Sequence, residues 1–357
     1  MIVLYLRNNL VTNLEATGLG TSFAFLDQPT GVDIAGSNFR PSQPIRSALL
    51  VGVKNTLALV IVGLPLLTVL GVIVGVARLS TNWLVAKLAA IYVETLRNVP
   101  PLLVIFFAFN ALFLELPPIA ESLTPLGLVV INNRALSFVS FSAREGAEIL
   151  ALVAVLALLG AALVWRWRTV RFDRTGEPHH RVAWGLGTVF VAVGVAYFAL
   201  GRPVGLSRPE VQGLVVTGGI SGLAAYFAVL MALVLYTTSH VAEIVRGSIQ
   251  AVPKGQTEAA NALALSAFQR LRFVVLPQAF RIATPPIINQ YLNFTKNTSL
   301  AIAVGFAEVT RITFQAIGNA NPAPQLIAVL MLIYLAFSLA ISTVTNIVNR
   351  RFQLVGR

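Results

Sequence analysis

Apolar residues are grouped in long segments, which polar and Gly- or Pro-containing stretches separate. A helix needs about 20 apolar residues to cross the hydrocarbon layer of a membrane, and several segments reach that length. The pattern predicts seven crossings, at residues 48–77, 88–115, 147–166, 182–201, 218–245, 280–307 and 325–348. The second and the sixth contain charged residues and Pro-Pro pairs, so we expect kinks in them.

The first 46 residues lack such a segment. From residue 7 to residue 46 the chain is polar, and glycines and prolines interrupt any long periodic run, so we expect a loop-like structure. Short cytoplasmic loops retain Lys and Arg, which orients the crossings. Most basic residues fall inside when the C-terminus, with Arg350, Arg351 and Arg357, is cytoplasmic. The odd number of crossings then puts residues 1–46 on the non-cytoplasmic side.

The composition points to a membrane protein. Apolar residues make up 56% of the chain and charged residues 11%, whereas an average soluble domain has about 25% charged residues. Lipid is therefore the solvent for most of the chain. We predict an all-α integral membrane protein that forms a multi-span helical bundle.

Motifs for covalent chemistry are missing from the sequence. The chain has no cysteine and three histidines, and these do not form a metal-binding pattern, because His179 and His180 sit together in a predicted loop. The dipeptide Gly-Lys does not occur, which excludes a Walker A phosphate loop. We therefore expect no catalytic site, metal or cofactor in this chain. If ATP drives the protein, another chain must bind it.

The net charge of +12 raises the question of nucleic-acid binding. The most basic stretch is RWRTVRFDRTGEPHHR, residues 166–181, between two predicted crossings. Arginines at such a position are typical of topology anchoring beside anionic lipid headgroups. We therefore expect membrane lipid, and not nucleic acid, as the partner of this stretch.

The segment between the fifth and sixth crossings is too long for a simple connector. Pro253 can begin a helix, and strong helix formers follow it. Ser266 and Gln269 fit a capping box, which predicts a second helix directly after Ser266. Pro277 predicts a bend where this surface element turns into the next crossing.

This loop, with EAANALALSAFQRLRFVVLP at residues 258–277, resembles the EAA loop of permease subunits of ABC importers. The family pattern is E-A-A, three residues, G, nine residues, I, any residue, and L-P. The residues that match at the expected spacing are Glu258, Ala259, Ala260, Leu276 and Pro277. Ala264 replaces the usual Gly and Val274 the usual Ile. We expect the turn to form without a left-handed residue at 264, because Ser266 caps the next helix.

The resemblance implies that the loop docks into a groove of a cytoplasmic ATPase subunit, which binds ATP and Mg. The loop would then convert nucleotide-driven closure into rotation of the membrane spans. In this role Glu258 is a polar contact or a charge at a helix N-terminus. The alternative is an amphipathic hairpin that lies on lipid headgroups.

Segments on both sides of the loop are similar to permeases for polar amino acids. They are YVETLRNVPPLLVIFF (92–107), AEIVRGSIQAVPKGQTEAA (242–260) and LPQAFRIATPPIINQYLNFTKNTSL (276–300). The longer permeases of general L-amino-acid uptake systems are similar in having an insertion as well. The resemblance implies a type I ABC importer permease core of five spans, plus a two-span insertion, in the bacterial inner membrane.

This resemblance divides the chain into four parts. They are a polar non-cytoplasmic segment at 1–46, the first two core spans at 47–114, the two-span insertion at 115–217, and the last three core spans at 218–357, with the EAA loop near 247–279. The longer permeases have a further span before the polar segment, where this chain has only MIVLYL. Either that span is absent or the start of the sequence is set too late.

The resemblance also implies the partners. The chain would form half of a translocation pore for polar L-amino acids, together with a second permease subunit that is a related chain or another copy. An extracytoplasmic solute-binding protein would deliver the amino acid. The sequence leaves open which amino acids are carried.

Polar residues recur at near-helical spacing within the sixth crossing. They are Asn289, Asn293, Lys296 and Asn297. Polar groups at membrane depth normally face protein or a water-filled cavity. An amino acid would find a cation in Lys296 and amide groups in the asparagines, so one interpretation is a substrate pathway. The other is a set of interhelical hydrogen bonds that hold the bundle together.

Three Glu-x-x-Arg sequences place opposite charges on one helix face. They are Glu94 with Arg97, Glu243 with Arg246, and Glu308 with Arg311. We expect structural ion pairs, with gating as the alternative. An ion-gradient-driven secondary transporter or channel for small polar solutes would need membrane-embedded carboxylates, and these glutamates are the candidates. Such a transporter is the alternative to an ATP-driven importer.

Overall fold

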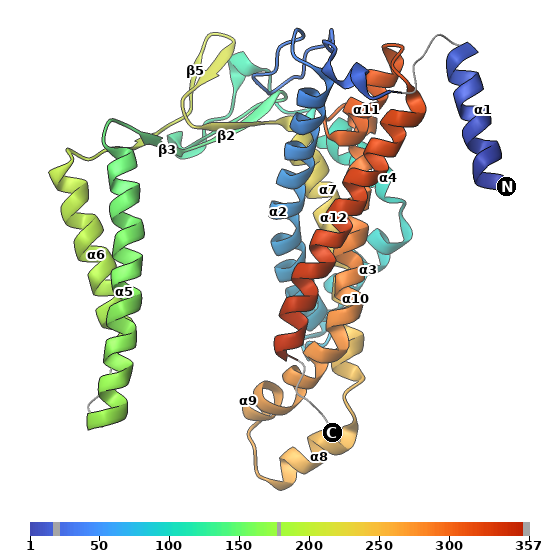
Figure 1. The fold of residues 1–357 in the computed structure, drawn as a ribbon. Helices are drawn as coiled ribbons and strands as arrows, with labels where there is room; N and C mark the ends of the chain where they lie inside the picture. The colour runs from blue at the N-terminus through green and yellow to red at the C-terminus, as the bar shows by residue number, and fades with distance from the viewer. Residues whose placement is uncertain (17–21, 177–179, 353–357) are drawn as a thin grey trace. The chain divides into compact units, whose positions relative to one another are not determined.

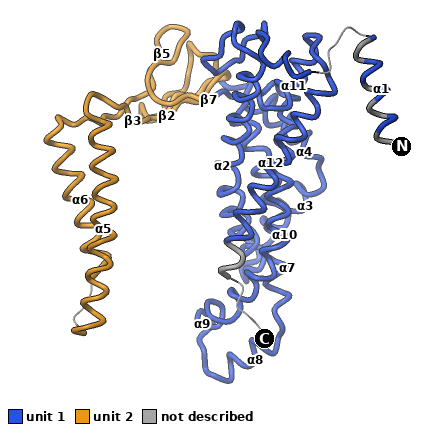
Figure 2. Tube along the Cα trace, in the orientation of Figure 1, with its two compact units in different colours: residues 1–116, 223–357 blue, residues 117–222 orange. Residues whose placement is uncertain are grey.

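The structure is a computed structural model that describes residues 1–16, 22–176 and 180–352. It divides into two compact units, unit 1 with residues 1–116 and 223–357, and unit 2 with residues 117–222 (Figure 2). Outside the described parts lie His179, Arg357 and the side chains of Arg350 and Arg351.

Unit 1 is a bundle of helices (Figure 1). Its long helices are α2 (Ile45–Ala77), α7 (Ala224–Gln250), α10 (Leu276–Asn297) and α12 (Ala323–Phe352). The shorter ones are α1 (Ile2–Ala16), α3 (Trp83–Asn98), α4 (Pro101–Phe107), α8 (Lys254–Ala262), α9 (Ala267–Arg270) and α11 (Val309–Gly318). Irregular helical segments extend three of them, namely the π-helices Ala108–Phe113 after α4 and Leu271–Val275 after α9, and the 3-10 helix Thr298–Val304 after α10.

Unit 2 contains a helical hairpin of α5 (Ala147–Thr175) and α6 (Arg181–Ala199). In the described residues, five helices are long and apolar enough to cross a membrane, namely α2, α5, α6, α7 and α12. The number rises to seven if each of two bent helix pairs counts as one span. The helical membrane fold that the apolar pattern predicts is therefore confirmed.

One of the two bent pairs has its bend at a Pro-Pro pair, in the predicted crossing 88–115. The segments 83–98 and 101–113 meet at 107°, because Val99 is extended in front of the Pro-Pro pair and a residue before proline avoids the helical conformation. The segments 267–304 and 309–318 meet at 48°. This bend follows Val304, whereas Pro285 and Pro286 lie inside α10, so it is not the kink expected at these prolines. The crossing expected at 88–115 is thus two helices at a sharp angle.

The N-terminal segment is not loop-like throughout. Helix α1 covers Ile2–Ala16, so the expected loop from residue 7 onward is wrong for residues 7–16. The glycines and prolines that interrupt the segment begin only at Gly18, and nothing before it prevents a helix. Between residues 22 and 44 the chain is irregular apart from a short 3-10 helix, Ala24–Asp27.

Helices α2 and α7 form the centre of unit 1. The fully buried apolar side chains around them include Leu59, Leu67, Ile105, Val229, Leu233 and Phe294. Glycines on α2 allow this close packing. A Cβ at Gly63 would collide with the ring of Phe294, and one at Gly75 would lie 2.7 Å from the carbonyl oxygen of Ala242. Small residues at such positions let helix backbones approach closely in a membrane.

Unit 2 also contains short strands, which the all-α prediction did not include. They are β1 (Val129–Ile131), β2 (Ala135–Phe138), β3 (Ser140–Ala143), β4 (Val204–Ser207), β5 (Glu210–Gln212), β6 (Val215–Thr217) and β7 (Ile220–Leu223). Strands β1, β2 and β7 form one sheet, β3 and β4 a second, and β5 and β6 a third. Strands of three or four residues are too short for a period of two to identify them in the sequence.

The antiparallel pair β3–β4 closes the open end of the hairpin. Strand β3 precedes α5 and β4 follows α6, and Ala143 is paired with Val204. The start of α5 and the end of α6 are thus held together by the backbone hydrogen bonds of the β3–β4 pair.

Candidate functional site

The loop between α7 and α10 folds as two short helices, as predicted (Figure 1). Pro253 precedes α8 with an extended backbone. Ser266 caps α9, since its Oγ accepts from the Gln269 amide at 3.3 Å and its own amide donates to Gln269 Oε1 at 2.9 Å. The predicted capping box is therefore confirmed. We call residues 251–277 the coupling loop.

The turn between α8 and α9 contains a left-handed residue. Ala264 has φ of +55°, a conformation that glycine adopts freely and alanine only at a cost. Its amide donates to the carbonyl of Asn261 at 2.9 Å, and the amide of Leu265 donates to the carbonyl of Ala260 at 3.1 Å. These two bonds make a Schellman motif, whose C′ residue must be left-handed. The expectation that residue 264 would avoid this conformation is wrong.

Pro277 does not break the helix. The chain stays helical from residue 267 to residue 304, and Pro277 lies in the first turn of α10. A proline lacks an amide hydrogen and crowds the carbonyl four residues earlier. The wider π-helical turn, Leu271–Val275, stands directly before it and is where the helix accommodates this change. The coupling loop is thus continuous with α10.

Side-chain hydrogen bonds join α8 to the following helices. Arg270 Nη1 donates to Asn261 Oδ1 at 2.6 Å, and Gln278 Nε2 donates to Gln256 Oε1 at 3.1 Å. Together with the Schellman motif, these bonds connect both ends of α8 to the helix that leads into the membrane bundle.

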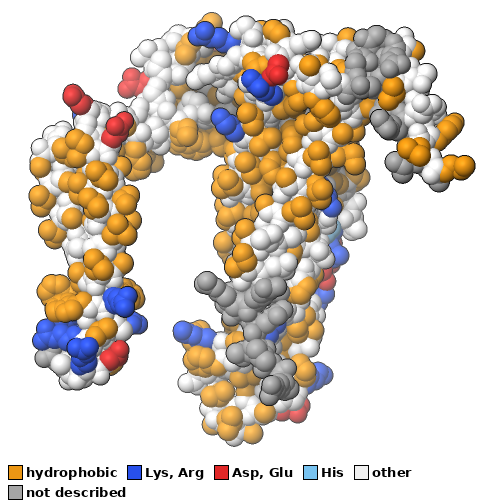
Figure 3. Space-filling view, viewed as in Figure 1, with side chains coloured by type: hydrophobic (Ala, Val, Ile, Leu, Met, Phe, Trp, Pro, Cys, Tyr) orange, Lys and Arg blue, Asp and Glu red, His pale blue; other side chains and the backbone are white. Residues whose placement is uncertain are grey.

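The surface of the coupling loop is partly apolar. Leu263, Phe268 and Phe273 are each more than 60% exposed, and hydrophobic side chains cover the lower tip of the loop in Figure 3. Isolated exposed apolar residues are ordinary, but a group of large ones outside the membrane bundle is typical of a protein interface.

The residues of the E-A-A sequence lie on different sides of α8. Glu258 and Ala259 are exposed, whereas Ala260 is buried. Glu258 is the fifth residue of α8, so the interpretation as a charge at the helix N-terminus is wrong, because that effect is confined to the first turn. Its carboxylate has no partner within the described parts of the chain. Ala264, Leu276 and Pro277 are exposed as well.

The polar residues of α10 face away from the bundle. Asn289, Asn293 and Lys296 are exposed and Asn297 is half-buried, while Phe294 on the opposite side is completely buried. None of these four polar side chains has a hydrogen-bond partner in residues 1–16, 22–176 or 180–352. The structure therefore contains none of the interhelical hydrogen bonds expected from them within one chain.

Glu308 caps a helix and does not pair with Arg311. Its side chain is completely buried and accepts from the backbone amides of Thr310 and Arg311 at 2.9 and 2.7 Å. The hydroxyl of Tyr334 on α12 donates to it at 3.1 Å. Glutamate is not among the preferred N-cap residues, so the only feature in the sequence that points to this role is that negative charge is favoured near a helix N-terminus.

A cluster of charges joins α2, α3 and α7. The predicted pair Glu243–Arg246 is confirmed at 2.5 Å, but Glu243 also pairs with Arg78 and lies 3.9 Å from Arg97. Glu94 is 3.5 Å from Arg78, so the predicted Glu94–Arg97 pair is wrong within the described residues. Within the described residues, no group of three or more His, Cys, Asp or Glu side chains could hold a metal ion.

Comparison with known families identifies one match over most of the chain. Residues 68–354 match the family described as "Binding-protein-dependent transport system inner membrane component". The matched range includes the coupling loop and the polar face of α10.

Three relatives match over nearly the whole chain. The general L-amino acid transport system permease protein AapQ of Rhizobium johnstonii is 37% identical, over 99% of this chain and 89% of its own length. The putative amino-acid ABC transporter permease protein YhdX of Escherichia coli is 36% identical, over 100% and 91%. The glutamate/glutamine/aspartate/asparagine transport system permease protein BztB of Rhodobacter capsulatus is 34% identical, over 99% and 91%.

A solved structure shares the fold. It is described as an amino acid ABC transporter with histidines, and it aligns with a TM-score of 0.51 at 18% identity, over 86% of this chain and 94% of that chain. At this identity the similarity concerns the fold alone.

Proposed function

We propose a function from the premise that this chain belongs to the family of binding-protein-dependent transport system inner membrane components. The chain is a multi-pass inner membrane permease, and we propose that it forms half of the pore of an ATP-driven importer for polar L-amino acids. The names of AapQ, YhdX and BztB support amino acids as the substrate class. The observation that carries the proposal is the coupling loop.

The coupling loop has the properties of a lever for a separate ATPase. Its exposed apolar side chains need a partner in the aqueous phase, and Glu258 adds an exposed carboxylate to the same loop. Because the helix is continuous from residue 267 to residue 304, a displacement of the loop is transmitted to α10. A rigid element with a docking surface at one end is what alternating access requires. ATP and Mg would be bound by the partner.

The polar face of α10 supports a pore between two permease subunits. Polar side chains at membrane depth must face protein or water. Asn289, Asn293 and Lys296 are exposed on the outer surface of their own bundle, so they need a partner outside it. A second permease subunit on this face would enclose them in a polar pathway. Lys296 would then attract the carboxylate of an amino acid that an extracytoplasmic solute-binding protein delivers.

We propose that residues 115–217 are a two-span insertion into a five-span core, with support from the separate compact unit at 117–222. We further propose that residues 1–46 lie on the non-cytoplasmic side.

The test of the coupling loop is affinity purification of the tagged chain from its native membrane in mild detergent. We expect a P-loop ATPase to be recovered with the wild type and at least tenfold less with Glu258→Lys. Glu145→Lys, at another exposed glutamate outside the coupling loop, is the matched control and should recover the ATPase normally. If no ATPase is recovered, or if both variants behave alike, the proposed coupling is wrong.

Transport measurements separate the two classes of transporter. Uptake of labelled polar amino acids should continue when the proton gradient is dissipated and ATP is held constant, and an ion-driven transporter would stop. In assembled complexes Lys296→Ala and Asn293→Ala should each reduce uptake at least tenfold while ATPase recovery stays normal. Normal uptake by both variants would remove these residues from the substrate pathway.

A further inference from the structure

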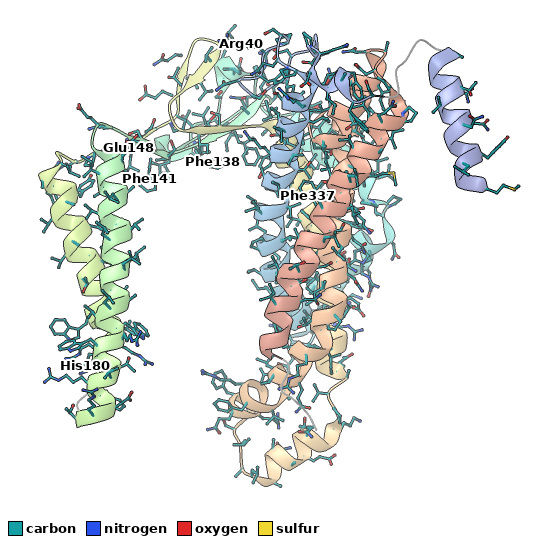
Figure 4. All side chains as sticks on the ribbon, viewed as in Figure 1. Arg40, Phe138, Phe141, Glu148, His180 and Phe337 are labelled. Atoms are coloured by element: carbon teal, nitrogen blue, oxygen red, sulfur yellow. The ribbon has the colours of Figure 1, made fainter. Side chains whose placement is uncertain are left out.

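Arginine and tryptophan side chains gather at one end of the α5–α6 hairpin, and the proposed import function does not use them. We call this group the Arg–Trp cluster, and its members are Trp165, Arg166, Trp167, Arg168, Arg171, Arg174, Arg181 and Trp184. Figure 3 shows basic side chains concentrated at this end of the hairpin and hydrophobic ones along its length. Figure 4 places His180 at the same end and Glu148 at the other.

The cluster is held in place by stacking between the two helices. The guanidinium carbon of Arg168 on α5 lies 5.4 Å from the ring centre of Trp184 on α6. In the reverse direction, Arg181 on α6 lies 5.0 Å from the ring centre of Trp165 on α5. Cation–π contacts within about 6 Å are attractive. These reciprocal contacts arrange positive charge around the rings before any ligand binds.

The depth of the cluster matches a lipid headgroup layer. Helix α5 has 29 residues, which is roughly 44 Å at 1.5 Å per residue, whereas the hydrocarbon layer is about 30 Å thick. The arginines follow the apolar part of α5, so they lie beyond the hydrocarbon. Tryptophans are typical of this interfacial layer, and basic residues there attract anionic lipids.

An apolar groove begins at the cluster and runs along α6. It has a volume of about 410 Å³ and is lined by Ala183, Trp184, Gly187, Thr188 and Val191. A Cβ added at Gly187 would meet no atom within 4 Å, so the missing side chain leaves the groove open. The groove follows the helix from Trp184 to Val191, which is from the headgroup layer into the hydrocarbon layer.

We propose that the Arg–Trp cluster and this groove form one binding site for an anionic phospholipid. The arginines bind the headgroup phosphate, since a guanidinium that stacks through its face still presents N–H groups at its edge. The groove takes the first part of an acyl chain. An apolar groove beside the phosphate site favours a phospholipid over free phosphate, and the net positive charge of the cluster favours anionic over zwitterionic headgroups.

Tryptophan fluorescence tests this site in the full-length chain. Three of the four tryptophans belong to the cluster, so Trp83→Phe leaves only these as emitters. The protein is reconstituted in phosphatidylcholine vesicles that contain a small fraction of phosphatidylglycerol brominated on the acyl chain. We expect this lipid to quench at a concentration at least fivefold lower than equally brominated phosphatidylcholine. Equal quenching by the two lipids would overturn the proposal.

Arginine and glycine variants, each with a matched control, locate the binding. Arg168→Gln and Arg181→Gln should each raise the half-quenching concentration of the anionic lipid about fivefold, the effect of one basic residue at an anionic surface. Arg202→Gln is the control, because Arg202 stacks on Phe198 at the opposite end of the hairpin and should change nothing. An equal effect of Arg202→Gln would show general charge attraction and overturn the site.

Gly187→Leu should fill the groove and weaken quenching by the anionic lipid at least threefold without touching an arginine. Gly194→Leu is the control on the same helix, at a glycine whose added Cβ also meets no atom within 4 Å but which does not line the groove. If both glycine variants bind like the wild type, no acyl chain occupies the groove. Millimolar inorganic phosphate should not reverse the quenching, and reversal would indicate a free phosphate site in place of a lipid site.

Discussion

Replacement of Ala264 by glycine should stabilise the coupling loop. Ala264 is exposed, and its φ of +55° lies in the left-handed region. An L-residue there costs roughly 1–2 kcal/mol. Glycine removes this cost. It also gives the unfolded chain more backbone freedom, which destabilises the folded turn by about 0.5–1 kcal/mol. The balance is a stabilisation of roughly 0.5–1 kcal/mol for the turn.

Amide hydrogen exchange measures this balance directly. The amides of Ala264 and Leu265 donate the two bonds of the Schellman motif, so their exchange reports how often the turn opens. Ala264→Gly should slow exchange of the Leu265 amide by about two- to fivefold, since a factor of five corresponds to about 1 kcal/mol. Ala264→Val should accelerate it, because a β-branched residue tolerates this conformation worse.

The control is the same chemical change two residues earlier. Ala262 is the last residue of α8 and is exposed, so Ala262→Gly should weaken the helix end by about 0.5–1 kcal/mol. Opposite effects of the two glycine substitutions are the signature of the left-handed turn. If both accelerate exchange, Ala264 is not left-handed in the protein and the reasoning is refuted.

Three further substitutions should lower the temperature of unfolding in detergent. Glu308→Ala removes the cap of α11 and leaves one buried and one partly buried amide without an acceptor, at a cost of about 2 kcal/mol, and Glu308→Gln should recover part of it. Glu243→Gln removes the charge that faces Arg78, whose side chain is 13% exposed, and should cost about 1–3 kcal/mol. Gly52→Ala places a Cβ 2.8 Å from the Cα of Val309 and should cost about 1–3 kcal/mol. An unchanged melting temperature of any of these variants would contradict the contacts of the substituted residue. Gly255→Ala is the control for Gly52→Ala, because a Cβ added at Gly255 meets no atom within 4 Å.

Features that depend on neighbours in the chain were accessible from the sequence. The apolar segments predict the membrane helices because a helix satisfies its backbone hydrogen bonds within one segment. The capping box was equally accessible, since Ser266 and Gln269 are three residues apart. The left-handed turn at 264 differs from the prediction, and its signal in the sequence is the position itself, where the family pattern has glycine. The strands of unit 2 were not predicted, because three or four residues are too few to show the alternation of apolar and polar positions.

Which polar groups meet was decided by the tertiary structure. Glu243 and Arg78 are 165 positions apart, and only the packing of α2 against α7 brings them together, so the local Glu-x-x-Arg pattern identified one partner and missed the other. Glu308 is buried because Tyr334 and the N-terminus of α11 close over it. The sequence by itself determined the helices, the coupling loop and the polar residues of α10. The fold alone determined that these polar residues face outward, because the side of a helix that becomes buried depends on distant helices and not on its own residues.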